Sequence, residues 1–126
     1  FLYLEDGVLD KAQADFDAAL KHHRFEMLAH YGRGIIAYRE KRWADAVTHF
    51  GEAYRSDPKR PETLYYLALA FHHHHDNENA RRWMEQAVSA FAGVDERRKA
   101  DAQKWLKEFQ KALAAKPPQP RLPGAG

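Results

Sequence analysis

Four consecutive histidines at residues 72–75 are the side chains of this chain best suited to chemistry. Neutral imidazoles bind transition metals, and His72 and His75 have the three-residue spacing of neighbours on a helix face. A structural metal site, however, needs four converging ligands, and the nearest acids, Asp76 and Glu78, fall at an expected turn. We therefore predict no metal site. We interpret the run as a helix C-terminus, where imidazolium charge complements the helix dipole. A metal-binding protein that uses residues 72–75 is the alternative.

No other group of residues has the spacing of a catalytic site. Ser56 and Ser89 have no nearby His and Asp pattern and lack the sharp turn of a hydrolase nucleophile. The glycines of residues 32–34 do not follow a strand, so they do not form a phosphate-binding loop. The paired acids Asp15 and Asp17 are ordinary surface charges. We expect no catalytic residues, no cofactor and no enzymatic activity.

Composition narrows the class of partner. The chain has 126 residues, enough for one domain, with 20 Lys and Arg against 18 Asp and Glu. A net charge of +2 is weak for a nucleic-acid binder, so we expect no such partner. Residues 94–126 hold eight Lys or Arg against four acids. This excess predicts a solvated helix face, or alternatively a basic docking face for an acidic partner.

The sequence leaves the compartment open. There is no cysteine, which rules out disulfides but fits several compartments. No apolar run approaches the roughly 18 residues that cross a bilayer, so we expect no membrane insertion. The chain begins at Phe1, within an apolar helical pattern, and we expect it to be part of a longer protein.

Helical periodicity covers the chain up to residue 116, and no segment alternates with period two. We expect a break at Asp6-Gly7, helices at 9–22 and 26–40 joined by a link at 23–25, and a tight turn at 41–42. Further helices are expected at 43–55, 61–74, 78–92 and 95–116. Their ends are marked by Pro61 at a first helical position, Asp76 or Asn77 and Asp95 as caps, and Gly93 as a terminator.

Three alanines, Ala12, Ala46 and Ala80, lie 34 residues apart, and each begins the same pattern. A large, a small and a large residue follow at offsets of four, seven and eight, which marks one helix face. Recurrence at a fixed period predicts a repeat array, in which each unit buries its apolar face against the next. The copies are Ala12, Phe16, Ala19 and Leu20; Ala46, Phe50, Ala53 and Tyr54; and Ala80, Met84, Ala87 and Val88.

The second copy and its surroundings resemble the tetratricopeptide repeat, a 34-residue helix–turn–helix with small and aromatic residues at set positions. Gly34 falls where that family has a small residue in its first helix, and Pro58 closes the unit. The resemblance covers about residues 1–92. It implies an all-α, right-handed solenoid of helix–turn–helix units with a C-terminal capping helix. The matching residues include Tyr31, Gly34, Tyr38, Trp43, Ala46, Phe50, Ala53 and Pro58, followed by Ala68, Phe71, Ala80 and Ala87.

The same resemblance implies the domain organisation. We expect a repeat domain at residues 1–116, followed by a Pro- and Gly-rich tail or linker at 117–126. Within the domain, residues 1–24 form a partial first repeat, 27–60 a second, 61–93 a third and 94–116 the capping helix.

In this family the first helices of the units line a groove that holds a peptide or helix of a partner. The resemblance therefore implies a protein–protein interaction module, part of a larger scaffold or assembly. Some of the tyrosines in this groove would instead pack against neighbouring helices. The predicted partner-binding residues are Leu28, Tyr31, Ile35, Tyr38, Arg39, Tyr65, Tyr66, Leu69, His72 and His73, with Lys99, Gln103 and Leu106 as an extension. The alternative is a structural role, in which copies associate as a homo-oligomer through the open N-terminal end.

Overall fold

The computed structural model describes residues 2–115, with side chains from residue 11 onward, and consists of five helices in this range. They are α1 (Leu2–Arg39), α2 (Trp43–Ser56), α3 (Pro61–His73), α4 (Asn77–Phe91) and α5 (Glu96–Ala115). Helices adjacent in sequence pack against one another from α1 to α5, which confirms the predicted all-α helical repeat. Its right-handed sense and its unit boundaries stay predictions. The tail at 117–126 lies outside the described residues.

The helix ends follow the local signals of the sequence. Pro61 is the first residue of α3, where its missing N–H costs no hydrogen bond. Asp76 caps α4, because its Oδ1 accepts a bond of 3.1 Å from the Asn79 N–H. Asp95 accepts a bond of the same length from the Arg98 N–H at the start of α5. Gly93 follows α4 at φ +76°, a conformation that glycine adopts without strain.

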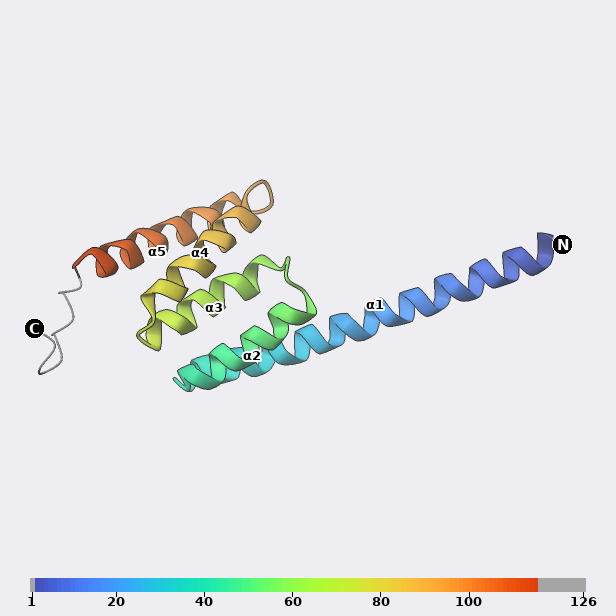
Figure 1. The fold of residues 1–126 in the computed structure, drawn as a ribbon, viewed down its shortest axis with the longest axis horizontal. Coiled ribbons are helices and arrows are strands. Elements are labelled where there is room, and N and C mark those ends of the chain that lie inside the picture. The colour runs from blue at the N-terminus through green and yellow to red at the C-terminus, as the bar shows by residue number, and fades with distance from the viewer. Residues whose placement is uncertain (1, 116–126) are drawn as a thin grey trace, which may run out of the picture.

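The first helix differs from the prediction. The expected break at Asp6-Gly7 and the expected link at residues 23–25 are both wrong, because α1 continues through them. The link contains neither Pro nor Gly, and His22 bonds to Glu26 one turn later at 3.0 Å. A single glycine costs a helix only about 1 kcal/mol, which a long helix tolerates. The N-terminal part of α1 therefore extends away from the other helices as a rod rather than folding back as a hairpin (Figure 1).

Two apolar clusters hold the other helices together. One lies where α1, α2 and α3 meet and contains Phe50, Ala37 and Leu67. Gly34 of α1 makes room for the Phe50 ring, since a Cβ there would lie 2.6 Å from it. The second cluster joins α3, α4 and α5 and contains Met84, Phe91 and, from α5, Ala102 and Phe109. Small residues at these crossings let the helices approach closely. The first helices of successive pairs, α1, α3 and α5, are thereby fixed relative to one another.

Candidate functional site

Aromatic rings connect α1 to α3 through Tyr66. Its ring centroid lies 6.3 Å from Tyr31 and 5.8 Å from Tyr38, both on α1, and 5.4 Å from Tyr65 on α3. All three pairs are edge-to-face, the arrangement that ring quadrupoles favour. These four tyrosines are half-buried. The helix packing thus brings together the four predicted groove tyrosines as one continuous aromatic surface, with each ring partly open to solvent.

An arginine covers one end of this surface. The Arg60 guanidinium lies 4.1 Å above the centre of the Tyr31 ring, a cation–π geometry. The Arg60 Nε also lies 3.7 Å from a Glu62 carboxylate oxygen. Arg60 precedes α3, so its position is set by the short α2–α3 connection. This end of the surface therefore has both an aromatic face and a positive charge.

Burial favours the protonated form of three of the tyrosine hydroxyls. It is the main cause that raises the pKa of Tyr31, Tyr38 and Tyr65 above the ordinary value of 10.0. The nearby Arg60 charge opposes this shift of the pKa at Tyr31. Tyrosine hydroxyls are protonated at neutral pH without this shift as well, so all three can donate hydrogen bonds to a ligand.

The histidine run is engaged in packing. His73 stacks on Trp43, with ring centroids 4.4 Å apart and planes inclined by 17°. His72 lies 4.9 Å from the Phe109 ring of α5, and its Nδ1 is 2.7 Å from the Asn77 side-chain oxygen. The spacing of His72 and His75 suggested that they share a helix face. They do not, because α3 ends at His73 and His75 has φ 62°. Within residues 11–115, no group of three or more His, Cys, Asp or Glu side chains is placed to hold a metal ion.

The predicted groove residues differ in how far a partner can reach them. Leu69 is only 5% exposed and belongs to the α3–α4–α5 cluster, so its placement on an open surface is wrong. The physical reason is the close approach of α5, whose Ala102 and Phe109 belong to the same cluster. Leu28 and Arg39 are exposed, and the remaining predicted residues are half-buried: Tyr31, Ile35, Tyr38, Tyr65, Tyr66, His72 and His73.

Between α3 and α5 the surface is hollowed on both sides of Tyr65. A hollow of about 440 Å³ is lined by Tyr65, Tyr66 and the first turns of α5. A second, of about 550 Å³, is lined by Tyr65, Trp105 and the middle of α5. We call these two adjoining hollows the α3–α5 groove. Its lining on this side consists of Asp95, just before α5, and of the α5 residues Arg97, Arg98, Asp101, Lys104, Trp105, Lys107, Glu108 and Lys111.

The sequence had suggested other residues of α5 for this place. Of those, Lys99 lies within 3.6 Å of Glu96, Leu106 packs against the core, and Gln103 is exposed but does not line either hollow. The seven-residue spacing of Arg97, Lys104 and Lys111 was the available signal for the correct face, because residues seven apart lie on one side of a helix.

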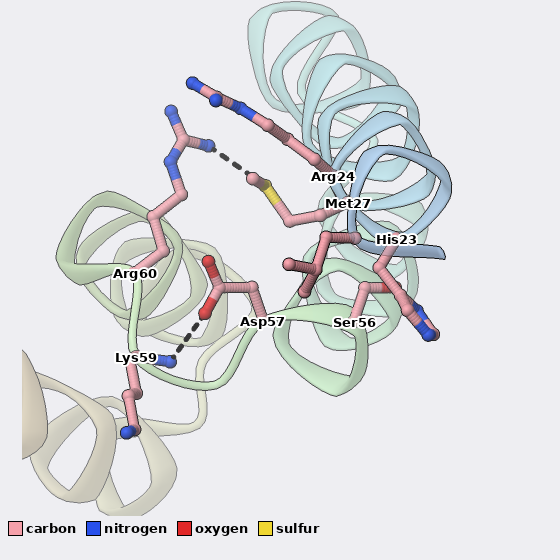
Figure 2. A pocket seen from close by; sticks show the side chains of 8 residues that line it. His23, Arg24, Met27, Ser56, Asp57, Lys59 and Arg60 are labelled. Atoms are coloured by element: carbon pink, nitrogen blue, oxygen red, sulfur yellow. Dashed lines mark hydrogen bonds between the residues drawn. The ribbon is translucent and has the colours of Figure 1, made fainter. Parts of the chain in front are cut away.

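A separate hollow of about 750 Å³ lies between α1 and the α2–α3 connection (Figure 2). The Arg60 Nη1 donates to the Met27 sulfur across 3.5 Å, and Arg24 extends toward the same side. Below them the Lys59 backbone N–H donates to Asp57 at 3.1 Å. This hollow was not expected from the sequence. It arises because α1 continues straight past the α2–α3 connection.

Antiparallel neighbouring helices with small residues at their crossings define a helical-repeat protein. The family model of the tetratricopeptide repeat matches this chain over residues 2–61 and again over residues 42–95. The chain therefore belongs to the tetratricopeptide repeat family. No curated protein matches the chain at a significant level.

Tetratricopeptide repeats are generally non-catalytic modules for protein–protein interaction and typically bind protein partners. Among the described residues 2–115, no helix combines the length and the apolar character needed to span a membrane.

Proposed function

We propose that this chain is a non-enzymatic interaction module that binds a segment of a partner protein along its tyrosine-rich surface. The observation that carries the proposal is the continuous set of half-buried rings that joins α1, α3 and α5. Tyr31, Tyr38 and Tyr66 make the first junction, and His72 with Trp105 makes the second, above the fully buried Phe109. A surface that crosses three helices suits an extended or helical segment better than a compact small molecule.

The chemistry of the surface supports a peptide ligand. Half-buried tyrosines offer broad apolar faces together with hydroxyl donors, and they are already ordered by packing, which lowers the entropy cost of binding. Aromatic residues and arginine also dominate the binding energy of protein interfaces. Tyr65, Tyr66 and Arg60 combine these properties at adjoining positions. We propose that they contribute most of the affinity, within a larger scaffold or assembly.

The test is partner capture by purified chain against a groove variant. Tyr65→Ala with Tyr66→Ala removes the centre of the surface, and proteins bound by the wild type should be lost about tenfold or more, the loss that 1.4 kcal/mol produces. The matched control is Arg82→Ala with Gln86→Ala on the exposed face of α4, which should retain them. Quantitative mass spectrometry of the captured proteins gives the comparison. Equal losses with both variants would exclude the tyrosine surface as the binding site.

The double tyrosine variant removes rings that also touch Phe50 and Phe91, so its folding needs a check by circular dichroism. A photo-crosslinking amino acid at position 65 of the otherwise unchanged chain gives an independent measurement. It should attach to the captured partner, whereas the same amino acid at position 82 should not. Attachment only from position 82 would place the binding site on the opposite side.

Self-association is the second candidate, and exposed apolar residues on α1 favour it. Phe16, Leu20 and Phe25 of α1 are each more than half exposed. Acidic Asp15 and Asp17 precede basic Lys21 and Arg24, so two antiparallel copies of this segment would place opposite charges together. Sedimentation equilibrium checks this. The mass should rise toward that of a dimer with concentration, and a constant monomer mass at millimolar concentration would exclude it.

A further inference from the structure

Three basic residues form a line along α5. Arg97, Lys104 and Lys111 are seven residues apart, and each is exposed. At 1.5 Å of rise per residue, successive members lie about 10 Å apart along the helix. Lys107 lies beside this line and borders the same hollow as Lys104 and Lys111. The helix therefore presents regularly spaced positive charges to one side.

This line of charge borders the aromatic surface rather than free solvent alone. Arg97 lines the smaller hollow of the α3–α5 groove, and Lys104 and Lys111 line the larger one. Tyr65 lines both hollows, and the half-buried Trp105 lines the larger. A bound segment would therefore meet aromatic faces and cationic groups at the same time.

The positive charges of the groove exceed what its own acids balance. Arg98 pairs with Asp95 at 3.7 Å, and Lys111 lies 4.0 Å from Glu108. The ion pairs found among residues 11–115 do not include Arg97, Lys104 or Lys107. Asp101 is the remaining acid that lines the groove. The balance is a positive surface with a few interspersed carboxylates.

We propose that the α3–α5 groove binds an acidic peptide segment, with apolar or aromatic residues between its carboxylates. The proposal rests on the proposed function and specifies the chemistry of the partner. In a polyproline II conformation a chain has three residues per turn and advances about 3.1 Å per residue, so Asp or Glu at every third position lie on one side, about 9 Å apart, close to the spacing of the basic line. The intervening side chains would pack on Tyr65 and Trp105, and the carboxylates would approach Arg97, Lys104 and Lys111, with Lys107 beside them.

The charges of the groove favour a peptide over a nucleic acid. Asp95, Asp101 and Glu108 lie among the basic residues. They would repel a backbone with a phosphate at every nucleotide, whereas a peptide can place neutral residues beside them. Single-stranded RNA is nevertheless included in the experiment as a competing class.

The experiment measures fluorescence anisotropy of three labelled 15-residue peptides with the intact chain. The peptides share the same Leu, Phe, Pro and Ser residues and differ at every third position, which is Glu, Gln or Lys. At 50 mM NaCl the Glu peptide should bind at least about tenfold more tightly than the Gln peptide. This advantage should shrink at 300 mM NaCl, because salt shortens the range of charge interactions. Equal or tighter binding of the Gln peptide, the Lys peptide or a 15-nucleotide oligouridylate would overturn the inference.

Charge-reversal variants locate the effect. Lys104→Glu with Lys107→Glu should weaken the Glu peptide by about tenfold or more. Lys11→Glu with Lys21→Glu on α1 changes the net charge equally, far from the groove, and should change the affinity by no more than about twofold. Equal weakening by both pairs would mean a non-specific charge effect and would overturn the inference.

Tyr65→Ala separates this inference from the proposed function. If Tyr65→Ala weakens every peptide that binds while Glu, Gln and Lys peptides bind alike, the groove binds peptides and the acidic preference is wrong. If Glu peptide binding is unaffected by Tyr65→Ala and by the Lys104 and Lys107 reversal, the segment does not occupy the α3–α5 groove. If Tyr65→Ala and the reversal both weaken the Glu peptide selectively, the inference is supported.

Discussion

The same residue pattern occurs in two helices with opposite consequences. Ala46, Phe50 and Ala53 of α2 are fully buried. Their counterparts 34 residues earlier in α1, Ala12, Phe16 and Ala19, are exposed, and the Phe16 ring is 60% exposed. Both segments are helical, and in each the pattern places its apolar residues on one face of the helix. The difference lies in the neighbours: α2 packs against both α1 and α3, whereas the N-terminal part of α1 extends away from the other helices and every residue from 11 to 26 is exposed.

The comparison shows that the burial of a residue depends on the neighbouring helices as well as on its own apolar character. In a repeat array each unit contributes one apolar face and receives the next. Phe50 packs against Gly34 of α1 on one side and against Tyr66 of α3 on the other. Phe16 has the same chemical character but has no such neighbours. Stability in this fold therefore depends on stacking, and a single pattern contributes little without it.

The largest expected effect is on Phe50. Phe50→Ala empties a fully buried site between three helices and should lower the free energy of unfolding by about 3–5 kcal/mol. Phe16→Ala should change it by no more than about 0.5 kcal/mol, because the ring is mostly solvated. Urea unfolding followed by circular dichroism measures both variants.

The same two variants can also show that Phe50 and Phe16 do not differ in this way. A loss below about 1 kcal/mol for Phe50→Ala would mean that the ring is not at a helix crossing. A loss above about 2 kcal/mol for Phe16→Ala would mean that Phe16 is covered in solution. Repeating the Phe16→Ala measurement over a range of protein concentrations would then show whether a second copy provides that cover.

Two glycine substitutions test how tightly α1 and α2 pack where Phe50 is buried. Gly34→Ala gains about 1 kcal/mol of helix propensity but forces the new methyl group against the Phe50 ring, an overpacking cost of about 1–3 kcal/mol. We expect a net loss of about 1 kcal/mol. Gly51→Ala in α2 has no atom within 4 Å of the new Cβ and should gain about 1 kcal/mol. Thermal unfolding gives both signs, and a stabilising Gly34→Ala would show that the α1–α2 crossing is loosely packed.

The sequence predicted α2 to α5 closely because their ends carry local signals. Pro61, Asp76, Asp95 and Gly93 act within a turn of the residues they affect, so no knowledge of the tertiary structure is needed to interpret them. The link expected at residues 23–25 had no such signal and agreed only with the unit boundaries that the repeat register implies. That register describes how a unit folds when its neighbours are present. Without a breaker, local helix formation prevails in α1.

The candidate site was predicted in part for a related reason. The resemblance to the family assigned the four tyrosines to one inner surface, and the structure places Tyr66 beside Tyr31, Tyr38 and Tyr65. The resemblance does not state how closely the next helix approaches. Leu69 shares that face of α3 in the sequence, but α5 covers it. The basic line of α5 was missed because its importance depends on which side of α5 faces Tyr65.

The smallest expected effect is a pH dependence of stability that arises from His73, among the packed helices, and not from the extended part of α1. Burial, together with the nearby His72 and His75, lowers the pKa of His73 below its ordinary value of 6.5. The folded state therefore binds a proton less readily than the unfolded chain. The stability contributed by neutral His73 is full above pH 6.5 and is lost as pH falls through 6.5 toward the lower folded pKa. Since His73 stacks on Trp43 at the α1–α2 turn, its protonation should destabilise the packing between α1, α2 and α3. It should leave the extended N-terminal part of α1 unaffected.

His73→Phe isolates this contribution because it keeps an aromatic ring against Trp43 but cannot titrate. Urea unfolding at pH 8 gives the packing change caused by the substitution alone, since His73 is neutral there. Between pH 8 and pH 5.5 the unfolding midpoint of the wild type should fall by more than that of His73→Phe. An identical fall in both proteins would show that His73 is as solvated as a histidine of the extended rod. The difference in burial between the packed helices and the extended part of α1 would then not apply to His73.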